Sequence, residues 1–256
     1  MEELVRVEHI YKNYHTVKGE TQVVRDLSLS VCDGEFLSII GPSGCGKTTV
    51  LSLIAGLIET SGGKILLDQK EVKGYSESVA YMLQRDYLFE WRTIEENIML
   101  GLQVRKKCTK ERRQKALGLL EKYGLGDFAK YYPQQLSGGM RQKVALIRTL
   151  AVDPELLLLD EPFSSLDYQT RLALSDEIAQ IIRTEKKTAV LVTHDIAEAI
   201  SMSDRVLMLS PRPTAVKTQV KIEFDDMDAS PIHKRQDAKF RSYFDFLWKE
   251  LAVHVE

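Results

Sequence analysis

Residues 41–49 read Gly41-Pro42-Ser43-Gly44-Cys45-Gly46-Lys47-Thr48-Thr49. The first eight fit the pattern G-x-x-x-x-G-K-[ST], and they lie between a short buried strand predicted at 35–40 and a helix predicted over 47–57. Glycines let such a loop point its backbone N–H groups at phosphate oxygens, and the following helix adds its positive dipole end. A chance glycine-rich turn is the alternative. The stretch predicts a phosphate-binding loop, with Lys47 at the β- and γ-phosphates, the Thr48 hydroxyl on Mg²⁺, and Cys45 as a small filler.

Two carboxylates end a second motif. The run Leu156–Leu159 is apolar throughout, and Asp160 and Glu161 follow it directly. An all-apolar strand is typical of a parallel sheet that is covered on both faces. Beside the phosphate loop, Asp160 can hold the Mg²⁺ ion through water, and Glu161 can polarise the attacking water as general base. Ordinary solvated acids at a strand end are the alternative interpretation.

The composition is that of an ordinary globular protein. The chain has 256 residues, 35 basic and 37 acidic side chains, a net charge of −2 and 44% hydrophobic residues, which excludes disordered, collagen-like and coiled-coil classes. No apolar run approaches the roughly 20 residues of a membrane helix, and the acidic start does not resemble a signal peptide. Three cysteines without metal-ligand spacing fit a reducing cytoplasm, and the balanced charge gives no reason to expect nucleic acid as a partner.

Strand and helix patterns divide the chain into segments. Residues 1–90 read mostly as strands and residues 91–150 as helices. Alternating strands and helices over 151–210 predict an α/β fold with a parallel sheet and right-handed crossovers. Residues 211–256 hold a strand candidate and an amphipathic helix. The apolar residues of that helix are spaced i, i+3, i+4, i+7 and i+11: Phe240, Tyr243, Phe244, Leu247 and Leu251.

Residues 136–142 carry a resemblance to a known family. They read Leu136-Ser137-Gly138-Gly139-Met140-Arg141-Gln142, which resembles the LSGGQ signature of ATP-binding cassette (ABC) ATPases, with Met140 in place of the motif's Gln. The order of the motifs along nearly the whole chain also resembles that family. The resemblance implies a P-loop ABC ATPase fold, with a RecA-like parallel-sheet core, an N-terminal antiparallel β lobe within 1–90 and an inserted helical subdomain at 91–150.

The signature has a physical rationale of its own. Ser137, Gly138 and Gly139 at the start of a helix would form a second phosphate-binding cap, although a flexible Gly-Gly hinge is the alternative. One chain cannot apply both caps to one ATP if they lie on different lobes. The resemblance implies that two copies pack head to tail, each ATP lying between the phosphate loop of one copy and the signature of the other.

Two more residues are assigned by the resemblance to nucleotide and metal. Tyr14 resembles the aromatic residue that stacks on adenine, with Tyr11 as a rival and a core aromatic as the alternative. Gln84, after a strand predicted at 78–83, resembles the Q-loop glutamine, which touches Mg²⁺ and water and flexes toward the membrane partner. An isolated glutamine would be a solvated loop residue.

The resemblance also assigns residues to the dimer interface and to catalysis. Asp167 ends the run Ser164-Ser165-Leu166-Asp167, which resembles the D-loop that crosses the interface; a helix N-cap is the alternative. His194, after a strand predicted at 188–193, resembles the switch histidine, whose imidazole can donate to the γ-phosphate.

Three longer stretches resemble the ATPases of nitrate, sulfonate and taurine importers. They read Leu88-Phe89-Glu90-Trp91-Arg92-Thr93, Pro162-Phe163-Ser164-Ser165-Leu166-Asp167-Tyr168-Gln169-Thr170-Arg171 and Leu209-Ser210-Pro211-Arg212-Pro213. The family usually has Leu-Pro-Trp where this chain has Phe89-Glu90-Trp91. The resemblance implies an ATP-hydrolysing subunit, with ATP and Mg²⁺ as cofactors, of a multi-subunit importer for a small anion or sulfonate-like solute. A soluble non-transport ABC ATPase and an importer ATPase for another small solute are the alternatives.

The partners follow from the same resemblance. They would be a second copy of the chain, separate transmembrane permease subunits and, indirectly, a periplasmic or extracellular solute-binding protein. The chain would lie on the cytoplasmic face of the inner membrane, held through the permease. Tyr87, Leu88, Phe89 and Trp91 follow Gln84 closely, and we expect them to line a groove for a short amphipathic helix of the permease. A buried core corner is the alternative.

Overall fold

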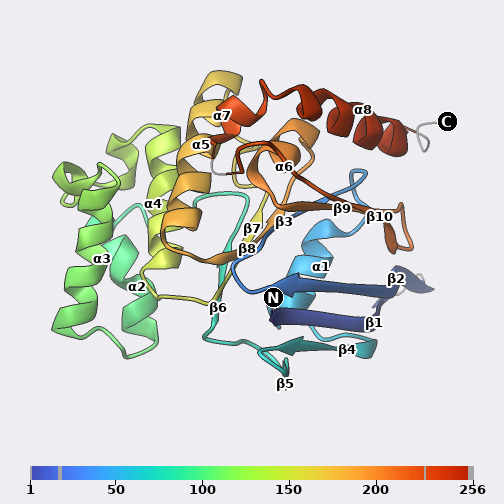
Figure 1. The fold of residues 1–256 in the computed structure, drawn as a ribbon. Coiled ribbons are helices and arrows are strands. Elements are labelled where there is room, and N and C mark those ends of the chain that lie inside the picture. The colour runs from blue at the N-terminus through green and yellow to red at the C-terminus, as the bar shows by residue number, and fades with distance from the viewer. Residues whose placement is uncertain (1, 17–18, 228, 253–256) are drawn as a thin grey trace.

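Two β-sheets organise the chain, in a computed structural model that describes residues 2–16, 19–227 and 229–252 (Figure 1). The smaller sheet consists, in spatial order, of β2 (Gly19–Cys32), β1 (Glu3–Thr16), β4 (Gly62–Leu67) and β5 (Lys70–Glu71). The larger sheet consists, in spatial order, of β10 (Val216–Lys221), β9 (Arg205–Leu209), β3 (Phe36–Ile40), β8 (Thr188–Val192), β7 (Leu156–Asp160) and β6 (Val79–Met82).

The smaller sheet is antiparallel, as the resemblance implied for the N-terminal lobe. β1 pairs antiparallel with both β2 and β4. Its inward residues Val5, Val7 and Ile10 are buried, while polar residues between them face solvent, which is the alternation expected of a half-covered sheet. At Gly63 the backbone has φ +75°, and a Cβ atom there would lie 2.2 Å from the His9 carbonyl oxygen, so glycine is required where β4 meets β1.

The larger sheet is parallel except for β10, which pairs antiparallel with β9. All residues of β3, β7 and β8 are buried, as predicted for a sheet covered on both faces. In β7, Leu156 and Leu158 face the smaller sheet and helix α1 (Lys47–Ile54), whereas Leu157 and Leu159 face the helical region. Because parallel strands end at one edge, the residues that follow β3, β7 and β8 come together there.

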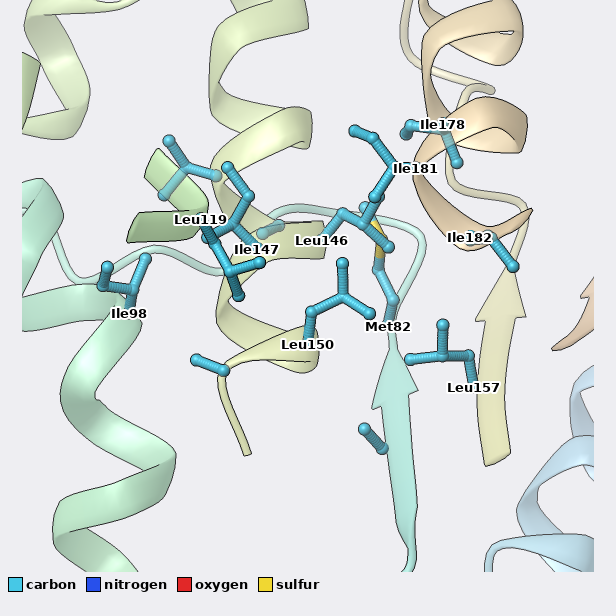
Figure 2. Packing of buried hydrophobic residues seen from close by; sticks show 14 of the residues in the cluster. Met82, Ile98, Leu119, Leu146, Ile147, Leu150, Leu157, Ile178, Ile181 and Ile182 are labelled. Carbon is cyan, nitrogen blue, oxygen red and sulfur yellow. The ribbon is translucent and has the colours of Figure 1, made fainter. Parts of the chain in front are cut away.

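The helical region is continuous with this core. It contains α2 (Ile94–Val104), α3 (Lys110–Lys122), the short 3-10 helices η1 (Gly126–Phe128) and η2 (Pro133–Gln135), and α4 (Gly138–Leu150). Figure 2 shows Leu146 and Leu150 of α4 lying between Ile98 on one side and Met82 and Leu157 of the sheet on the other. The helix that carries the signature is thereby packed directly on the sheet edge.

Further helices lie on the face of the larger sheet opposite α1. They are α5 (Tyr168–Thr184), α6 (Ile196–Met202), α7 (Pro231–Lys234) and α8 (Ala238–Ala252). Leu247 of α8 is fully buried, and the other four residues of the predicted apolar stripe pack around it against α6 and β9. The apolar stripe predicted from the periodicity is therefore confirmed as the packed face of this helix.

Some expected boundaries were wrong. The helix predicted over 47–57 ends at Ile54, because Gly56 has φ +68° and its N–H bonds the Leu53 carbonyl in a left-handed cap. The sequence did not predict β5 or α7, each of only a few residues. No helix within the described ranges is long and apolar enough to span a membrane.

Candidate active site

The predicted phosphate loop lies where β3 passes into α1. Gly44 and Gly46 have φ of +73° and +121°, which turns the backbone around the start of the helix. The Lys47 ammonium lies inside the loop and donates to the carbonyl oxygens of Gly41 (2.9 Å) and Pro42 (3.1 Å). An ammonium has three N–H donors, so one remains for a phosphate oxygen.

The loop borders an open cleft of about 220 Å³. Six of the nine predicted loop residues line it, and two side chains from other parts of the chain join them: Ser43, Gly44, Gly46, Lys47, Thr48, Thr49, Glu161 and Arg212. Cys45 is buried beneath the loop, and that burial raises the pKa of its thiol. A neutral buried thiol matches the predicted role of filler.

Asp160 lies at the end of β7 beside this cleft. Its Oδ1 accepts a hydrogen bond from the Thr48 hydroxyl at 3.2 Å, and its Oδ2 accepts one from the Tyr81 hydroxyl at 3.0 Å. Burial raises the pKa of Asp160, and both hydrogen bonds act against that rise. Sequence reasoning missed Tyr81. The available signal was a hydroxyl-bearing residue within an otherwise apolar strand.

Glu161 and His194 come together from the ends of β7 and β8. His194 Nδ1 lies 3.3 Å from Glu161 Oε2. Glu161 has φ +46°, a left-handed conformation that costs a non-glycine residue about 1 kcal/mol or more and is held here by its N–H bonding to the Val192 carbonyl at 2.8 Å. The backbone thus aims the Glu161 carboxylate into the cleft rather than along the strand.

Gln84 is connected to Glu161 by two hydrogen bonds in series. Its Nε2 donates to the Ser164 hydroxyl at 3.1 Å, and that hydroxyl donates to the Glu161 carbonyl at 3.0 Å. The Gln84 side chain is otherwise exposed. A displacement of Gln84 would therefore be transmitted to the backbone of Glu161 through the Ser164 side chain.

The signature residues lie apart from the phosphate cleft. Ser137 caps α4, its hydroxyl accepting from the Met140 N–H at 3.3 Å, and Asp167 caps α5, its carboxylate accepting from the Thr170 N–H at 3.1 Å. These two caps are neighbours, because a Cβ at Gly139 would lie 3.1 Å from the Thr170 methyl group. Within the described chain, Ser137, Gly138, Gly139 and Asp167 are not among the residues lining the cleft.

The two adenine candidates differ in exposure. The Tyr14 ring lies near the C-terminal end of β1 and is 38% exposed, with the Lys12 ammonium 5.1 Å from its centre. Tyr11 is half-buried against Gly62 of β4. The ring of Tyr14 is the more exposed of the two, so Tyr14 remains the better candidate for stacking on adenine.

The four apolar residues after Gln84 do not form one surface, which corrects the expected groove. Leu88 is a core residue, 6% exposed, whereas Trp91 is 73% exposed and its ring centre lies 4.9 Å from that of half-buried Phe89. Buried Asn97 fixes this turn by bonding both the N–H and the carbonyl of Phe89. What remains is exposed Trp91 packed against half-buried Phe89, with exposed Tyr87 nearby in sequence.

Glu90, the departure from the importer pattern, has a partner in the signature helix. Arg141 pairs with Glu90 at 2.8 Å and with Asp86 at 3.0 Å. Arg148 of the same helix donates to the carbonyl oxygens of Asp86 and Tyr87. The turn that follows Gln84 is therefore held to α4 by two arginines.

Comparison with known proteins places these features in a family. Residues 24–164 match the model of the ABC transporter family. The chain is 48% identical over 247 residues to the uncharacterized ABC transporter ATP-binding protein YtlC of Bacillus subtilis, covering 96% of this chain and 95% of that one. It is 43% identical over 201 residues to the taurine import ATP-binding protein TauB of Yersinia pestis, covering 78% and 79%. The solved dimer of the ATP-binding cassette MJ0796 bound to ADP and Pi superposes with a TM-score of 0.72 at 29% identity, over 86% of this chain and 99% of that one.

Proposed function

The chain belongs to the ABC transporter family and is an ATP-binding, ATP-hydrolysing subunit, and from this premise we propose that it energises a multi-subunit importer of a small anion of the taurine and sulfonate type. The observation that carries the transport part is the aromatic pair of exposed Trp91 and half-buried Phe89, which lies in the turn after Gln84. The solute class is supported by the similarity to the taurine import protein.

Hydrolysis is assigned to the residues at the edge of the larger sheet. The hydroxyl of Thr48 and the carboxylate of Asp160 are hard oxygen donors only 3.2 Å apart, which suits Mg²⁺, and the ion when bound would neutralise phosphate charge. Glu161 takes the proton of the attacking water as general base. His194 turns Nδ1 toward Glu161, so Nε2 is the nitrogen that would donate to the γ-phosphate, which it does when the ring carries both protons.

A second copy of the chain would complete each site. Ser137 and the glycines after it lie at a helix start, where backbone N–H groups favour an anion, yet they are not among the described residues lining the phosphate cleft of their own chain. Head-to-tail pairing would bring them to the partner's nucleotide, with Asp167 at the interface. The related dimeric cassette supports this arrangement.

The permease would dock on the aromatic pair. Aromatic side chains are frequent energetic centres of interfaces, and an exposed Trp91 offers such a centre. A coupling helix pressing there would act on Gln84, and through Ser164 on Glu161, while the Glu90–Arg141 pair would carry the same displacement to α4. In this proposal the chain lies at the cytoplasmic face of the membrane, attached through the permease.

Charge substitution at Trp91 tests the proposal. We expect Trp91→Glu to abolish co-purification with the permease and uptake of taurine, while the ATPase rate of the isolated subunit stays within about twofold. The matched control is Trp248→Glu, because Trp248 is also exposed but lies on α8. Normal uptake by the Trp91 variant would show that docking lies elsewhere. Uptake of another small solute instead of taurine would favour the alternative substrate class.

A further inference from the structure

The phosphate cleft holds a second cation besides Lys47. Arg212 lines the cleft together with Lys47 and Glu161, although it lies in the connection between β9 and β10, far along the chain from the phosphate loop. Within the part of the chain that the structure describes, no hydrogen bond or ion pair joins its guanidinium to another residue. The position of Arg212 is therefore not explained by a bond to another side chain of the described residues.

The connection that carries Arg212 is anchored on both sides. At its base, the Ser210 N–H donates to the Ala215 carbonyl oxygen at 3.0 Å. Thr214 is fully buried and joins β2, donating its N–H to the Val23 carbonyl at 2.7 Å and accepting from the Arg25 N–H at 2.9 Å. Figure 1 shows this connection beside the first half of β2, where Thr214 forms a bridge with Val24.

The same connection is tied to the phosphate loop itself. The Thr214 hydroxyl donates to the carbonyl oxygen of Cys45. A Cβ at Gly46 would lie 3.0 Å from that hydroxyl, so only glycine lets the loop approach this closely. Because Thr214 is held by β2 and by Cys45 at once, the backbone two residues before it is fixed relative to the loop.

Charge favours an anion at this place. Two of the three N–H donors of Lys47 bond the carbonyl oxygens of Gly41 and Pro42, which are neutral. Arg212 retains all five donors in a planar fork that matches phosphate oxygens. The charged side chains of the cleft are then two cations and one carboxylate.

We propose that Arg212 binds the phosphate chain of the nucleotide, as a second cation supplied from the β9–β10 connection. This inference rests on the proposal that residues 41–49 hold the nucleotide. It assigns a binding task to the Pro211-Arg212-Pro213 segment and makes Thr214 the residue that positions it.

Nucleotide binding by the purified full chain measures the effect. We expect Arg212→Ala to weaken ATP binding about tenfold, the usual effect of losing a hydrogen bond to a charged group, with thermal stability unchanged because the side chain is exposed. The loss should be smaller for AMP and absent for adenosine. Arg212→Lys should restore part of the affinity by restoring the charge.

Two controls separate this inference from the proposal beneath it. Arg241→Ala removes an exposed arginine of α8, and it should leave ATP affinity unchanged. Lys47→Ala should greatly weaken ATP binding; if it does not, the phosphate-loop proposal fails. If Lys47→Ala behaves as expected while Arg212→Ala binds ATP within twofold of wild type, or loses adenosine as strongly as ATP, the inference about Arg212 is overturned.

Discussion

Asp160 receives hydrogen bonds from two residues that are distant in sequence. Thr48 and Tyr81 each donate to one of its carboxylate oxygens, so the plane of the carboxylate is defined by two contacts rather than one. A carboxylate that holds a metal ion directly or through water needs such support, because outer contacts orient the ligand. Tyr81 is therefore a positioning residue for Asp160.

Removing the Tyr81 hydroxyl tests this role. Tyr81→Phe keeps the ring packing but leaves one oxygen of Asp160 without its donor, so we expect divalent-ion affinity in the presence of ADP to fall about fivefold. Titration with Mn²⁺ monitored by electron paramagnetic resonance measures it independently of turnover. Tyr168→Phe, at an exposed position, is the control. Equal Mn²⁺ affinity in both variants would contradict the assignment.

At the scale of elements, linear motifs were predictable and contacts between motifs were not. The phosphate loop and the β7 carboxylates are contiguous runs whose chemistry is readable from the residues themselves. Tyr81 and Arg212 enter the site only because β6 lies beside β7 and the β9–β10 connection lies beside β2. The same reason explains the error at Leu88, since an apolar run gives no indication of which residues turn inward.

Helix α6 provides a second example of a group that sequence reasoning overlooked. Glu198, in the first turn after His194, is buried, and burial raises its pKa to about 7. Thr193, Arg171 and Arg235 lower that pKa, and Asp195 raises it further. Ionisation of Glu198 therefore falls within the physiological range, four residues after the predicted switch histidine.

The pH dependence of stability follows from this shift. The folded protein keeps a proton on Glu198 up to about pH 7, whereas the unfolded chain releases it near the ordinary value of 4.5. The stability from this group is thus fully present below pH 4.5 and is lost as pH rises through 7, by at most about 3 kcal/mol. Glu198→Gln should remove that loss. Melting temperatures of both proteins between pH 5 and 8 measure it; a difference that does not grow with pH would contradict the expectation.

At the scale of the whole molecule, the proposed dimer would use each chain for one half of two nucleotide sites. The phosphate cleft lies at the edge of the larger sheet, and the signature lies at the start of α4, beside the Asp167 cap of α5. Arg141 and Arg148 of α4 bond the turn after Gln84. The signature at the start of α4 and the proposed permease surface on that turn are therefore directly connected. Dimer closure and permease docking should therefore be coupled through α4.

Glu161→Gln separates closure from hydrolysis. The variant keeps the shape of the side chain and its reach to His194, but an amide cannot take a proton from water, so ATP should bind while turnover falls by about 10² or more. Since hydrolysis is what would release the interface, the variant should accumulate as a dimer, visible as a doubled mass in size-exclusion chromatography with light scattering when ATP and Mg²⁺ are present. Adding Lys47→Ala to the same chain removes the charge that holds the phosphates, and the double variant should remain monomeric. A Glu161 variant that binds ATP, stays monomeric and turns over like wild type would assign the base to another residue and remove the reason for head-to-tail closure.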